Sequence, residues 1–288
     1  GLFSAIQAIV RSGDEVIVFD PAYDSYEPAV ALAGGRPVHV PLAISDAGFD
    51  FSSVWQRRGD ALSDRTRLVI INFPHNPTGA ILSEANHRQL AEVLRDSPAY
   101  LLSDEVYEHI VFDGEPHVSA LAIEELWERS FVVSSFGKTY HATGWKVGYC
   151  MAPAALTAEF RKVHQFTTFA VNTPMQHALA DFLQGNPAFH ERLPEFYQQK
   201  RDFFCRLLGE SRFRLHPARS TFFQILDYGD ISDENDVALA KRWTEEVGVA
   251  SIPLSVFCEQ PFTATRLRFC FAKDDDTLAA ACEKLSRL

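Results

Sequence analysis

The residue with the most reactive sequence context is a lysine in the middle of the chain. Lys138 follows an apolar run at residues 131–133 and lies in a polar turn at residues 135–146. This pattern predicts a buried strand whose C-terminal end carries the lysine. Burial disfavours the charged form of a lysine and frees its lone pair, which makes it a good amine nucleophile. A single lysine is more often a solvated surface residue, so the assignment depends on its neighbours.

Two of these neighbours are suited to holding a phosphate. Ser135 precedes the lysine with a hydroxyl group, and Lys146 follows it with a positive charge. A reactive amine beside a phosphate site matches pyridoxal phosphate (PLP), whose aldehyde forms a Schiff base with a lysine. We therefore predict that Lys138 binds PLP covalently.

Further polar residues stand where other predicted strands end. Asn76 follows the strand predicted at residues 67–72, and Asp104 and Tyr107 lie at the end of the strand predicted at residues 99–107. In open α/β sheets, ligands bind at the carboxyl ends of the strands. Four such residues from three successive strands, with Lys138 among them, form a much more specific signal than any one alone.

The elements that must position these residues alternate between short apolar strands and amphipathic helices. This alternation predicts an α/β fold with a largely parallel sheet flanked by helices. A polar stretch at residues 46–65 is expected to hold a helix around Trp55. We expect further strands at 14–19, 37–42 and 147–151, and helices at 1–11, 26–32, 83–95, 123–128 and, with an interruption, 153–183.

A turn at residues 185–187 is the best candidate for a domain boundary. We predict a large PLP-binding domain over residues 1–187 and a smaller α+β domain over residues 188–288. The smaller domain is expected to contain helices at 188–208, 236–247 and 275–288 and strands at 213–215, 221–226 and 266–271.

Composition excludes several classes of function. The chain has 288 residues and a net charge of -11, which argues against a nucleic-acid-binding protein. No apolar stretch is long enough to span a membrane. The five cysteines form no CxxC pair, so we expect free, mostly buried thiols in a reducing cytoplasm and no metal site.

Five motifs together resemble those of the fold-type-I PLP enzymes, in the class I aminotransferase group. They are PHNPTG at 74–79, SDEVY at 103–107, SFGKT at 135–139, GWKVG at 144–148 and RLRF at 266–269. The resemblance covers essentially the whole chain and implies the aspartate aminotransferase-like fold. Within the group the chain is most similar to the methionine and kynurenine (glutamine K) transaminase branch. Residues 20–28 and His141 point to its methionine-preferring side.

The resemblance implies a role for each residue around the cofactor ring. Lys138 would form the Schiff base and then move the proton between the substrate Cα and the cofactor. Asp104 would pair with the pyridinium nitrogen, and Tyr23 would stack on the ring. Asn76 and Tyr107 would hydrogen-bond the cofactor's phenolate oxygen.

The resemblance likewise assigns the phosphate and the substrate. Ser135 and Lys146 would hold the phosphate, although many relatives carry arginine at the second position. Arg268, with Asn76, would bind the substrate α-carboxylate. We expect Arg266 to point to the opposite face as an ordinary charge. Phe257 and residues 171–172 are weaker candidates for lining the substrate pocket, with core packing at least as good an explanation.

The chain opens inside a helix, at Gly1, without a cap or an initiator methionine. We expect an N-terminal segment of the natural protein to be absent, including part of the phosphate site. The 288 residues alone are therefore expected to bind PLP poorly and to fold marginally. By resemblance, the active sites of the family lie at a two-fold interface, so we expect a homodimer.

The function that this implies is transfer of an amino group from a hydrophobic, sulfur-containing or aromatic amino acid to a 2-oxo acid. Two alternatives remain open: a PLP-dependent C–S β-lyase acting on cysteine conjugates, and a non-catalytic regulatory module of the same fold. A nicotinamide-dependent oxidoreductase is disfavoured because no GxGxxG motif follows a strand.

Overall fold

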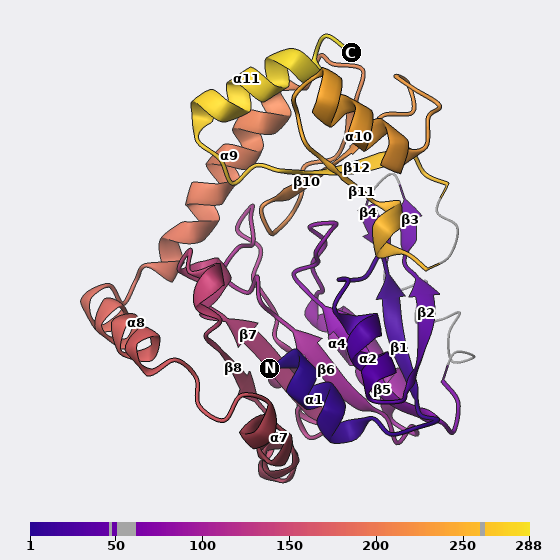
Figure 1. The fold of residues 1–288 in the computed structure, drawn as a ribbon, viewed down its shortest axis with the longest axis vertical. Helices are drawn as coiled ribbons and strands as arrows, with labels where there is room; N and C mark the ends of the chain where they lie inside the picture. Colours follow the sequence, from indigo (N-terminus) through magenta and orange to yellow (C-terminus); the bar gives the residue numbers. More distant parts are fainter. Residues whose placement is uncertain (46–47, 51–61, 260–262) are drawn as a thin grey trace.

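A computed structural model describes residues 1–45, 48–50, 62–259 and 263–288. Two sheets dominate these residues (Figure 1). The larger has six strands in the order β2-β1-β5-β6-β7-β8, and the smaller has four in the order β11-β12-β10-β9. A short hairpin, β3 (Ala43–Ser45) and β4 (Gly48–Asp50), stands beside them.

Five strands of the large sheet are parallel to one another. They are β1 (Glu15–Asp20), β2 (Arg36–Pro41), β5 (Thr66–Asn72), β6 (Tyr100–Asp104) and β7 (Ser130–Ser135). The sixth strand, β8 (Gly148–Met151), runs antiparallel to β7. The carboxyl ends of β1, β5, β6 and β7 therefore meet at one edge, as the predicted α/β fold requires.

Helices cover both faces of this sheet, which explains the continuous apolar runs in its strands. On β5, Leu68 and Ile70 pack with α1 (Leu2–Ile9), α2 (Tyr26–Leu32) and α7 (Ala154–Thr167). The alternate residues Val69 and Ile71 pack on the opposite face with α4 (Glu84–Leu94) and α5 (Glu124–Trp127). Helix α4 begins at the predicted N-cap, since the Ser83 side chain accepts from the Asn86 amide.

The rest of the chain builds the small sheet and its helices around a separate apolar cluster that includes Trp243 and Phe269. Its helices are α9 (Leu193–Leu207), α10 (Asp236–Glu246) and α11 (Asp275–Leu285), while α8 (Thr173–Gly185), between α7 and α9 in the chain, contributes no residue to this cluster. Its strands are β9 (Arg214–Leu215), β10 (Phe223–Asp227), β11 (Ile252–Pro253) and β12 (Arg266–Cys270). The mixed α/β architecture with a second, smaller sheet is confirmed. The domain boundary near residue 187 stays a prediction.

Two predicted elements differ in extent from those observed. The strand predicted to end at Tyr107 stops at Asp104, because residues 105–108 turn back through a Glu108 amide bond to the Glu105 carbonyl. The helix predicted from residue 188 begins at Leu193, after the 3-10 turn η4 (His190–Arg192), with a proline in its first turn. The helix predicted around Trp55 lies outside the described residues.

The five cysteines are free, as predicted, although Cys270 is exposed and only Cys282 is fully buried. Among the residues described, no helix is long and apolar enough to cross a membrane.

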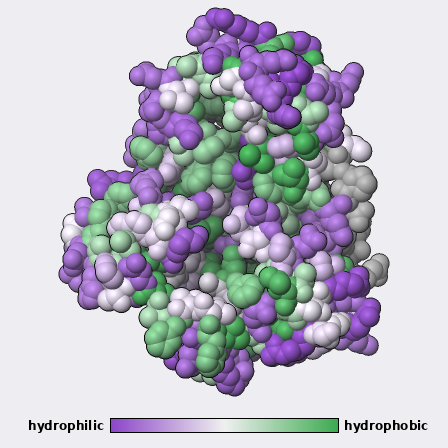
Figure 2. Space-filling model, viewed as in Figure 1, coloured by the Kyte–Doolittle hydropathy of each residue, from purple (hydrophilic) through white to green (hydrophobic). Residues whose placement is uncertain are grey.

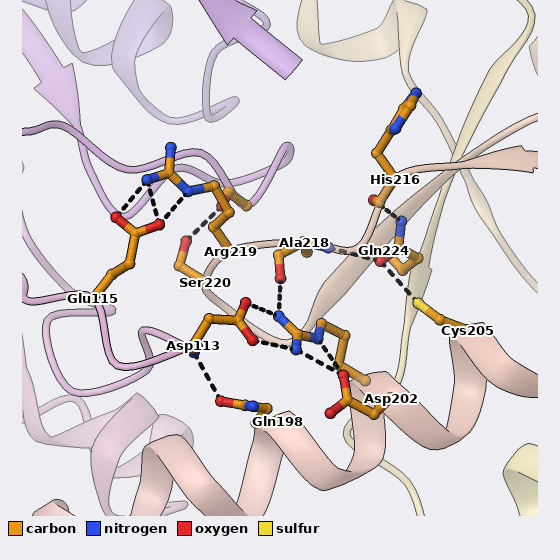
Figure 3. A network of polar contacts seen from close by, with 12 residues as sticks. Asp113, Glu115, Gln198, Asp202, Cys205, His216, Ala218, Arg219, Ser220 and Gln224 are labelled. Atoms are coloured by element: carbon orange, nitrogen blue, oxygen red, sulfur yellow. Dashed lines mark hydrogen bonds and ion pairs between the residues drawn. The ribbon is translucent and has the colours of Figure 1, made fainter. Parts of the chain in front are cut away.

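The two sheets are joined by a polar junction (Figure 3). An isolated β-bridge pairs Val111 with Ser220, and the flanking residues exchange backbone hydrogen bonds at 2.9 Å. The buried Arg201 of α9 reaches across to Asp113, with nitrogen–oxygen distances of 2.6 and 2.8 Å. Arg219 pairs with Glu115 in the same way nearer the surface.

The same junction holds the turn that carries Asn76. The Ser220 hydroxyl donates to the Gly79 carbonyl at 2.9 Å. Gly79 has a φ of +72°, and an added Cβ would lie 2.8 Å from the Ala218 Cβ. A side chain at this position would push apart the two halves of the molecule, by which we mean the large sheet with its helices and the small sheet with its helices. Glycine therefore keeps the turn of residues 74–79 against the small sheet.

Candidate active site

The carboxyl edge of the large sheet brings the turn of residues 74–79 next to β6. Asn72, the last residue of β5, lies opposite Asp104 in the register of the two strands. Its side-chain amide donates to the Asp104 carbonyl at 2.9 Å, and its Oδ1 accepts from the Asn76 amide at 3.1 Å. Asn72 thus fixes the start of the turn that presents Asn76.

Asp104 lies buried at the end of β6, beside the lysine strand. The Tyr26 hydroxyl donates to its Oδ2 at 2.7 Å, and the Val106 amide donates to its Oδ1 at 3.3 Å. Burial raises the pKa of the Asp104 carboxyl to about 6, in spite of these two donors. The side chain is therefore a buried acid that a cationic partner would stabilise in its charged form.

Lys138 lies on the next strand connection, in the single-turn helix α6 (Phe136–Thr139) that follows β7. Its Nζ is 5.8 Å from the centre of the Tyr107 ring and 5.6 Å from that of Phe222. Within the described part of the chain it makes no hydrogen bond or ion pair. Burial lowers the pKa of the Lys138 amine, as expected for a lysine that acts as a nucleophile.

Ser135 and Lys146 flank this lysine at the mouth of the sheet. Ser135 caps α6 by accepting from the Gly137 amide at 3.0 Å, and it donates weakly to the Val147 carbonyl at 3.3 Å. Lys146 precedes Val147, is exposed, and ends the 3-10 turn η3 (Thr143–Trp145). A Cβ on Gly137 would lie 2.9 Å from the Thr143 Cα, so glycine lets the two turns meet here.

Arg268 reaches this edge from the small sheet. Its Nη1 donates to the Asn76 Oδ1 at 2.6 Å, which links β12 to the 74–79 turn. Its guanidinium lies 4.0 Å from the Phe223 ring centre and 4.9 Å from that of Phe257. Burial lowers the pKa of the Arg268 guanidinium. The cation is thus held by one amide oxygen and two aromatic faces, and among the described residues its other donors make no hydrogen bond.

The expected orientation of Arg266 was wrong. Residues two apart in a strand share a face, so Arg266 and Arg268 lie on the same side of β12, opposite the buried Leu267 and Phe269. What separates the two arginines is position along the strand. Arg266 lies opposite Asp227 and pairs with its carboxylate at 3.8 Å.

Two tyrosines complete the cluster. Tyr107 is buried, and burial raises the pKa of its phenol, which keeps the hydroxyl protonated. Tyr23 is partly exposed, and its ring meets the Tyr26 ring edge-on at 5.6 Å. The Asp104 charge contributes to the raised pKa of both tyrosines, whose main cause is burial.

The weaker candidates for the substrate pocket, Phe257 and Asn172, differ in where they lie. Phe257 lies against Arg268, as described above. Asn172 instead accepts from the Met175 amide as the N-cap of α8 and is exposed. Cap formation accounts for this residue without a role in the site.

Several contributing residues were not identified from the sequence. Tyr26 and Asn72 were assigned to a helix and a strand without a role, and Phe222 was assigned to a strand. The signal available for Asn72 was a polar residue at the end of an apolar strand. For Tyr26 and Phe222 we find no local signal, because their partners are distant in sequence.

Comparison with known proteins shows which family the chain belongs to. The family described as "Aminotransferase class I and II" matches residues 1–285. The chain belongs to this aminotransferase family. It is 50% identical to the methionine aminotransferase of Escherichia coli over 287 residues, which are 100% of this chain and 73% of that protein. It is 32% identical to human kynurenine–oxoglutarate transaminase 1, over 99% of this chain and 74% of that protein.

Solved structures agree with the fold of this aminotransferase. The E. coli YbdL structure, described as having a methionine aminotransferase function, superposes with a TM-score of 0.95 at 50% identity and covers 100% of this chain and 75% of that one. N-succinyldiaminopimelate aminotransferase from Mycobacterium tuberculosis gives a TM-score of 0.93 at 36% identity, over 99% and 74% of the two chains. The resemblance inferred from the motifs is thereby confirmed, and with it the dependence on PLP.

The donor set of the site fits PLP. The cofactor carries an aldehyde, a basic ring nitrogen, a phenolate and a phosphate. The site offers an amine with no anionic partner among the described residues, Lys138, and a buried acid of raised pKa, Asp104. Asn76 and Tyr107 are buried donors, and Ser135 and Lys146 stand at the mouth.

Proposed function

We propose that this aminotransferase moves the amino group of a methionine-like or aromatic amino acid to a 2-oxo acid. The observation that carries the proposal is the 2.6 Å contact between Arg268 and Asn76 at the edge that holds Lys138 and Asp104. This contact places the Arg268 guanidinium, a group suited to binding a carboxylate, next to the residues suited to binding PLP. The similarity to methionine and kynurenine transaminases supports the substrate class.

In this proposal each side chain holds one part of the reacting pair. Arg268 forks the α-carboxylate, which fixes the position of the substrate Cα. The Lys138 amine would move the proton between the substrate Cα and the cofactor, and burial, which lowers its pKa, favours the neutral form that this task needs. Bound PLP supplies an electron sink for the electrons left at Cα.

The remaining residues hold the cofactor. Asp104 pairs with the ring nitrogen and keeps it protonated, while Tyr23 stacks on the ring. Asn76 and Tyr107 hydrogen-bond the phenolate oxygen. Ser135 and Lys146 bind the phosphate by hydroxyl and by charge.

The aromatic surroundings of Arg268 support an apolar donor side chain. Phe223 and Phe257 cover its guanidinium, and the Phe222 ring lies beside both the Lys138 amine and the Tyr107 ring. An amino acid held here by its carboxylate meets aromatic faces, which favour a thioether or an aromatic ring over a charged group.

The test combines cofactor capture with product analysis. The holoenzyme is reduced with borohydride, digested and mapped, with Lys138→Ala and the exposed Lys162→Ala compared in parallel. We expect a visible band that reduction removes and label on Lys138, lost only in Lys138→Ala. A panel of amino donors with 2-oxo acids then reports the products.

Methionine and aromatic donors should yield their own keto acids. Pyruvate and a thiol released from a cysteine conjugate, with no keto acid of the donor, would replace the proposal by the β-lyase. Cofactor capture without turnover of any donor would support the regulatory module instead.

We also propose that the protein is a homodimer and that it works in the cytoplasm. The second proposal rests on the five free cysteines. The first is supported by the large exposed side chains of Phe166 and Phe169, which are 86% and 83% exposed. Figure 2 shows apolar surface gathered over the lower edge of the molecule, where α7 lies. Apolar surface of this kind marks interaction sites.

Sedimentation tests the homodimer with matched variants. Burial of a phenylalanine contributes about 1.5–3 kcal/mol, so Phe166→Ser and Phe169→Ser should each weaken the dimer about tenfold or more. Leu32→Ser, which changes an equally exposed apolar residue on α2, should leave it intact. A monomeric parent protein would refute the proposal.

A further inference from the structure

A short segment of the small half, residues 254–259, lies between the two halves at the edge that carries the site (Figure 1). On the small side it is held by the buried Asp236, whose carboxylate accepts from the Ser255 amide at 2.9 Å and from its hydroxyl at 2.8 Å. On the large side, the Ala22 amide donates to the Phe257 carbonyl at 2.6 Å. The segment therefore spans the gap between β1 and the small sheet.

A histidine of the large sheet completes this contact. His39, on β2, makes a 2.7 Å hydrogen bond from Nδ1 to the Asp20 Oδ1. The other Asp20 oxygen accepts from the Glu259 amide at 3.1 Å. One carboxylate thus binds both the histidine of one half and the backbone of the other. The side chains of His39 and Asp20 are 4% and 3% exposed, so this hydrogen bond is shielded from solvent.

The second nitrogen of His39 has no hydrogen-bond partner among the described residues, although it is buried. It points to two carboxylates just beyond hydrogen-bond range, at 3.7 Å to Glu259 and 3.9 Å to Glu27. Glu27 belongs to α2 on the large half, and Glu259 to the spanning segment. The ion pair to Glu259 therefore crosses between the halves, and the pair to Glu27 does not.

The charge of this imidazole decides the strength of the contact. The groups that face it are the carboxylates of Asp20, Glu27 and Glu259 and the Cys258 thiol, whose pKa burial raises to about 12, so that it stays neutral. The hydrogen bond with Asp20 raises the pKa of His39, and the two glutamates add to this. When Nε2 loses its proton, its lone pair faces two negative charges, and the attraction across the gap is lost.

The contact bears on the site through Phe257. Its carbonyl is the acceptor for Ala22, and its ring lies 4.9 Å from the Arg268 guanidinium. The junction of Arg201 and Asp113 already joins the halves at a separate place (Figure 3). Together with the Ala22 hydrogen bond, the His39 contact therefore holds residues 254–259 against the large sheet, with the Phe257 ring beside Arg268.

We propose that His39 is a positioning residue for the substrate site: its imidazolium fastens residues 254–259 to the large sheet through Asp20 and Glu259 and so holds Phe257 against Arg268. The proposal rests on the proposed function, in which Arg268 binds the amino donor. It predicts an effect on donor binding and a smaller one on the chemical step.

The main variant is His39→Asn in the holoenzyme, because the asparagine amide can keep the hydrogen bond to Asp20 while removing the charge near Glu259. We expect the KM for the amino donor to rise about two- to fivefold with kcat changed less than twofold, the range expected for a partly exposed ion pair. In the parent protein KM should rise as the pH passes upward through the pKa of His39. In His39→Asn this pH dependence should be absent.

Two glutamate variants provide the matched control. Glu259 and Glu27 are similarly exposed, at 53% and 56%, and similarly distant from His39 Nε2. Glu259→Gln should reproduce the KM change and be non-additive with His39→Asn. Glu27→Gln should leave KM within twofold. Equal effects of the two glutamates would overturn the proposal, since only one of them crosses the gap.

Hydrogen exchange supplies a readout that needs no turnover. The Ala22 and Glu259 amides should exchange about tenfold faster in His39→Asn, while the Phe112 and Thr221 amides at the Arg201 junction keep their rates. Unchanged exchange of Ala22 and Glu259 would overturn the proposal even in an active enzyme. Faster exchange in a protein that transaminates no donor would uphold the contact and reject the proposed function, so the two failures are distinguishable.

Discussion

Arg268 and Asn76 are far apart in the sequence, yet the guanidinium Nη1 lies 2.6 Å from the amide Oδ1 and ties the small sheet to the turn after β5. This contact uses one donor of the fork, and in the proposed function the other donors, which have no partner among the described residues, bind the substrate carboxylate. Lysine at this position would keep the charge but lose the planar fork.

We therefore expect Arg268→Lys to lower kcat/KM for the amino donor about 10- to 100-fold, because one charge-assisted hydrogen bond contributes about 1.5–3 kcal/mol. Steady-state kinetics with a methionine-like donor measures this. Arg266→Lys on the same strand face is the control and should change kcat/KM less than about threefold, since its partner is Asp227. Comparable losses in the two variants would mean that Arg268 has no special role.

The Lys138 amine gives a second prediction that does not depend on turnover. Because burial lowers its pKa below the ordinary value of 10.5, a larger fraction of this amine is free at any pH below that value. In cofactor-free protein, trace acetylation of Lys138 followed from pH 7 to 11 should reach half its maximum at a lower pH than N-acetyl-lysine amide in the same tube. A midpoint equal to or above that of the free amide would contradict the burial that the structure shows.

The polar junction between the halves predicts which of its arginines contributes more to the free energy of unfolding. Arg201 is buried and holds Asp113, Asp202 and the Ala218 carbonyl, whereas the Arg219–Glu115 pair is partly exposed (Figure 3). Asp113 and Asp202 are about half exposed, so their carboxylates stay solvated when Arg201 is removed, and the loss is that of hydrogen bonds to charged groups, about 1.5–3 kcal/mol. An exposed pair contributes about 0–1 kcal/mol.

Urea unfolding should accordingly show a loss of about 1.5–3 kcal/mol in Arg201→Met and about 1 kcal/mol or less in Arg219→Met. Asp113→Asn should fall between them, because Arg201 keeps Asp202 and the Ala218 carbonyl. If Arg219→Met destabilised the protein as much as Arg201→Met, burial would not be what gives the junction its strength.

What could be predicted from the sequence was local or periodic. The strand at β5 followed from consecutive apolar residues, and the cap at Ser83 from its residue type before a helical pattern. Lys138, Asp104 and Asn76 could be brought together because parallel strands end at one edge. Their resemblance to a known family then supplied the roles, which remain to be tested.

What could not be predicted depends on contacts between distant segments. The Tyr26 hydroxyl meets Asp104 only because α2 packs beside the end of β6. His39 meets Glu259 although most of the chain separates them in sequence, and neither residue belongs to a motif. The wrong prediction for Arg266 had a different cause. Side chains two residues apart in a strand share a face, so the sequence alone places Arg266 on the same face as Arg268.

Asp104 gives the last prediction. Replacing it should stabilise the cofactor-free protein and weaken the binding of PLP. Its pKa rises from 3.8 to about 6 on burial, so the folded, cofactor-free protein binds this proton more tightly than the unfolded chain. The stability that this proton contributes is complete below about pH 4 and is lost as the pH rises through about 6. Cofactor-free Asp104→Asn should therefore be more stable than the parent above pH 6, by about 2–3 kcal/mol, since one pKa unit is about 1.4 kcal/mol.

PLP binding should show the opposite preference, because asparagine carries no charge to pair with a protonated ring nitrogen, and the affinity for PLP should fall about tenfold or more. Urea unfolding of the cofactor-free proteins from pH 4.5 to 7.5, with a PLP titration at pH 7.5, measures both effects. Tyr26→Phe tests the opposite change: it removes the 2.7 Å donor that lowers the pKa of Asp104, so the loss of stability with rising pH should continue to a higher pH than in the parent. A cofactor-free Asp104→Asn less stable than the parent at pH 7.5 would mean that the carboxylate is already compensated without PLP, and Asp104 would then lose its assigned role.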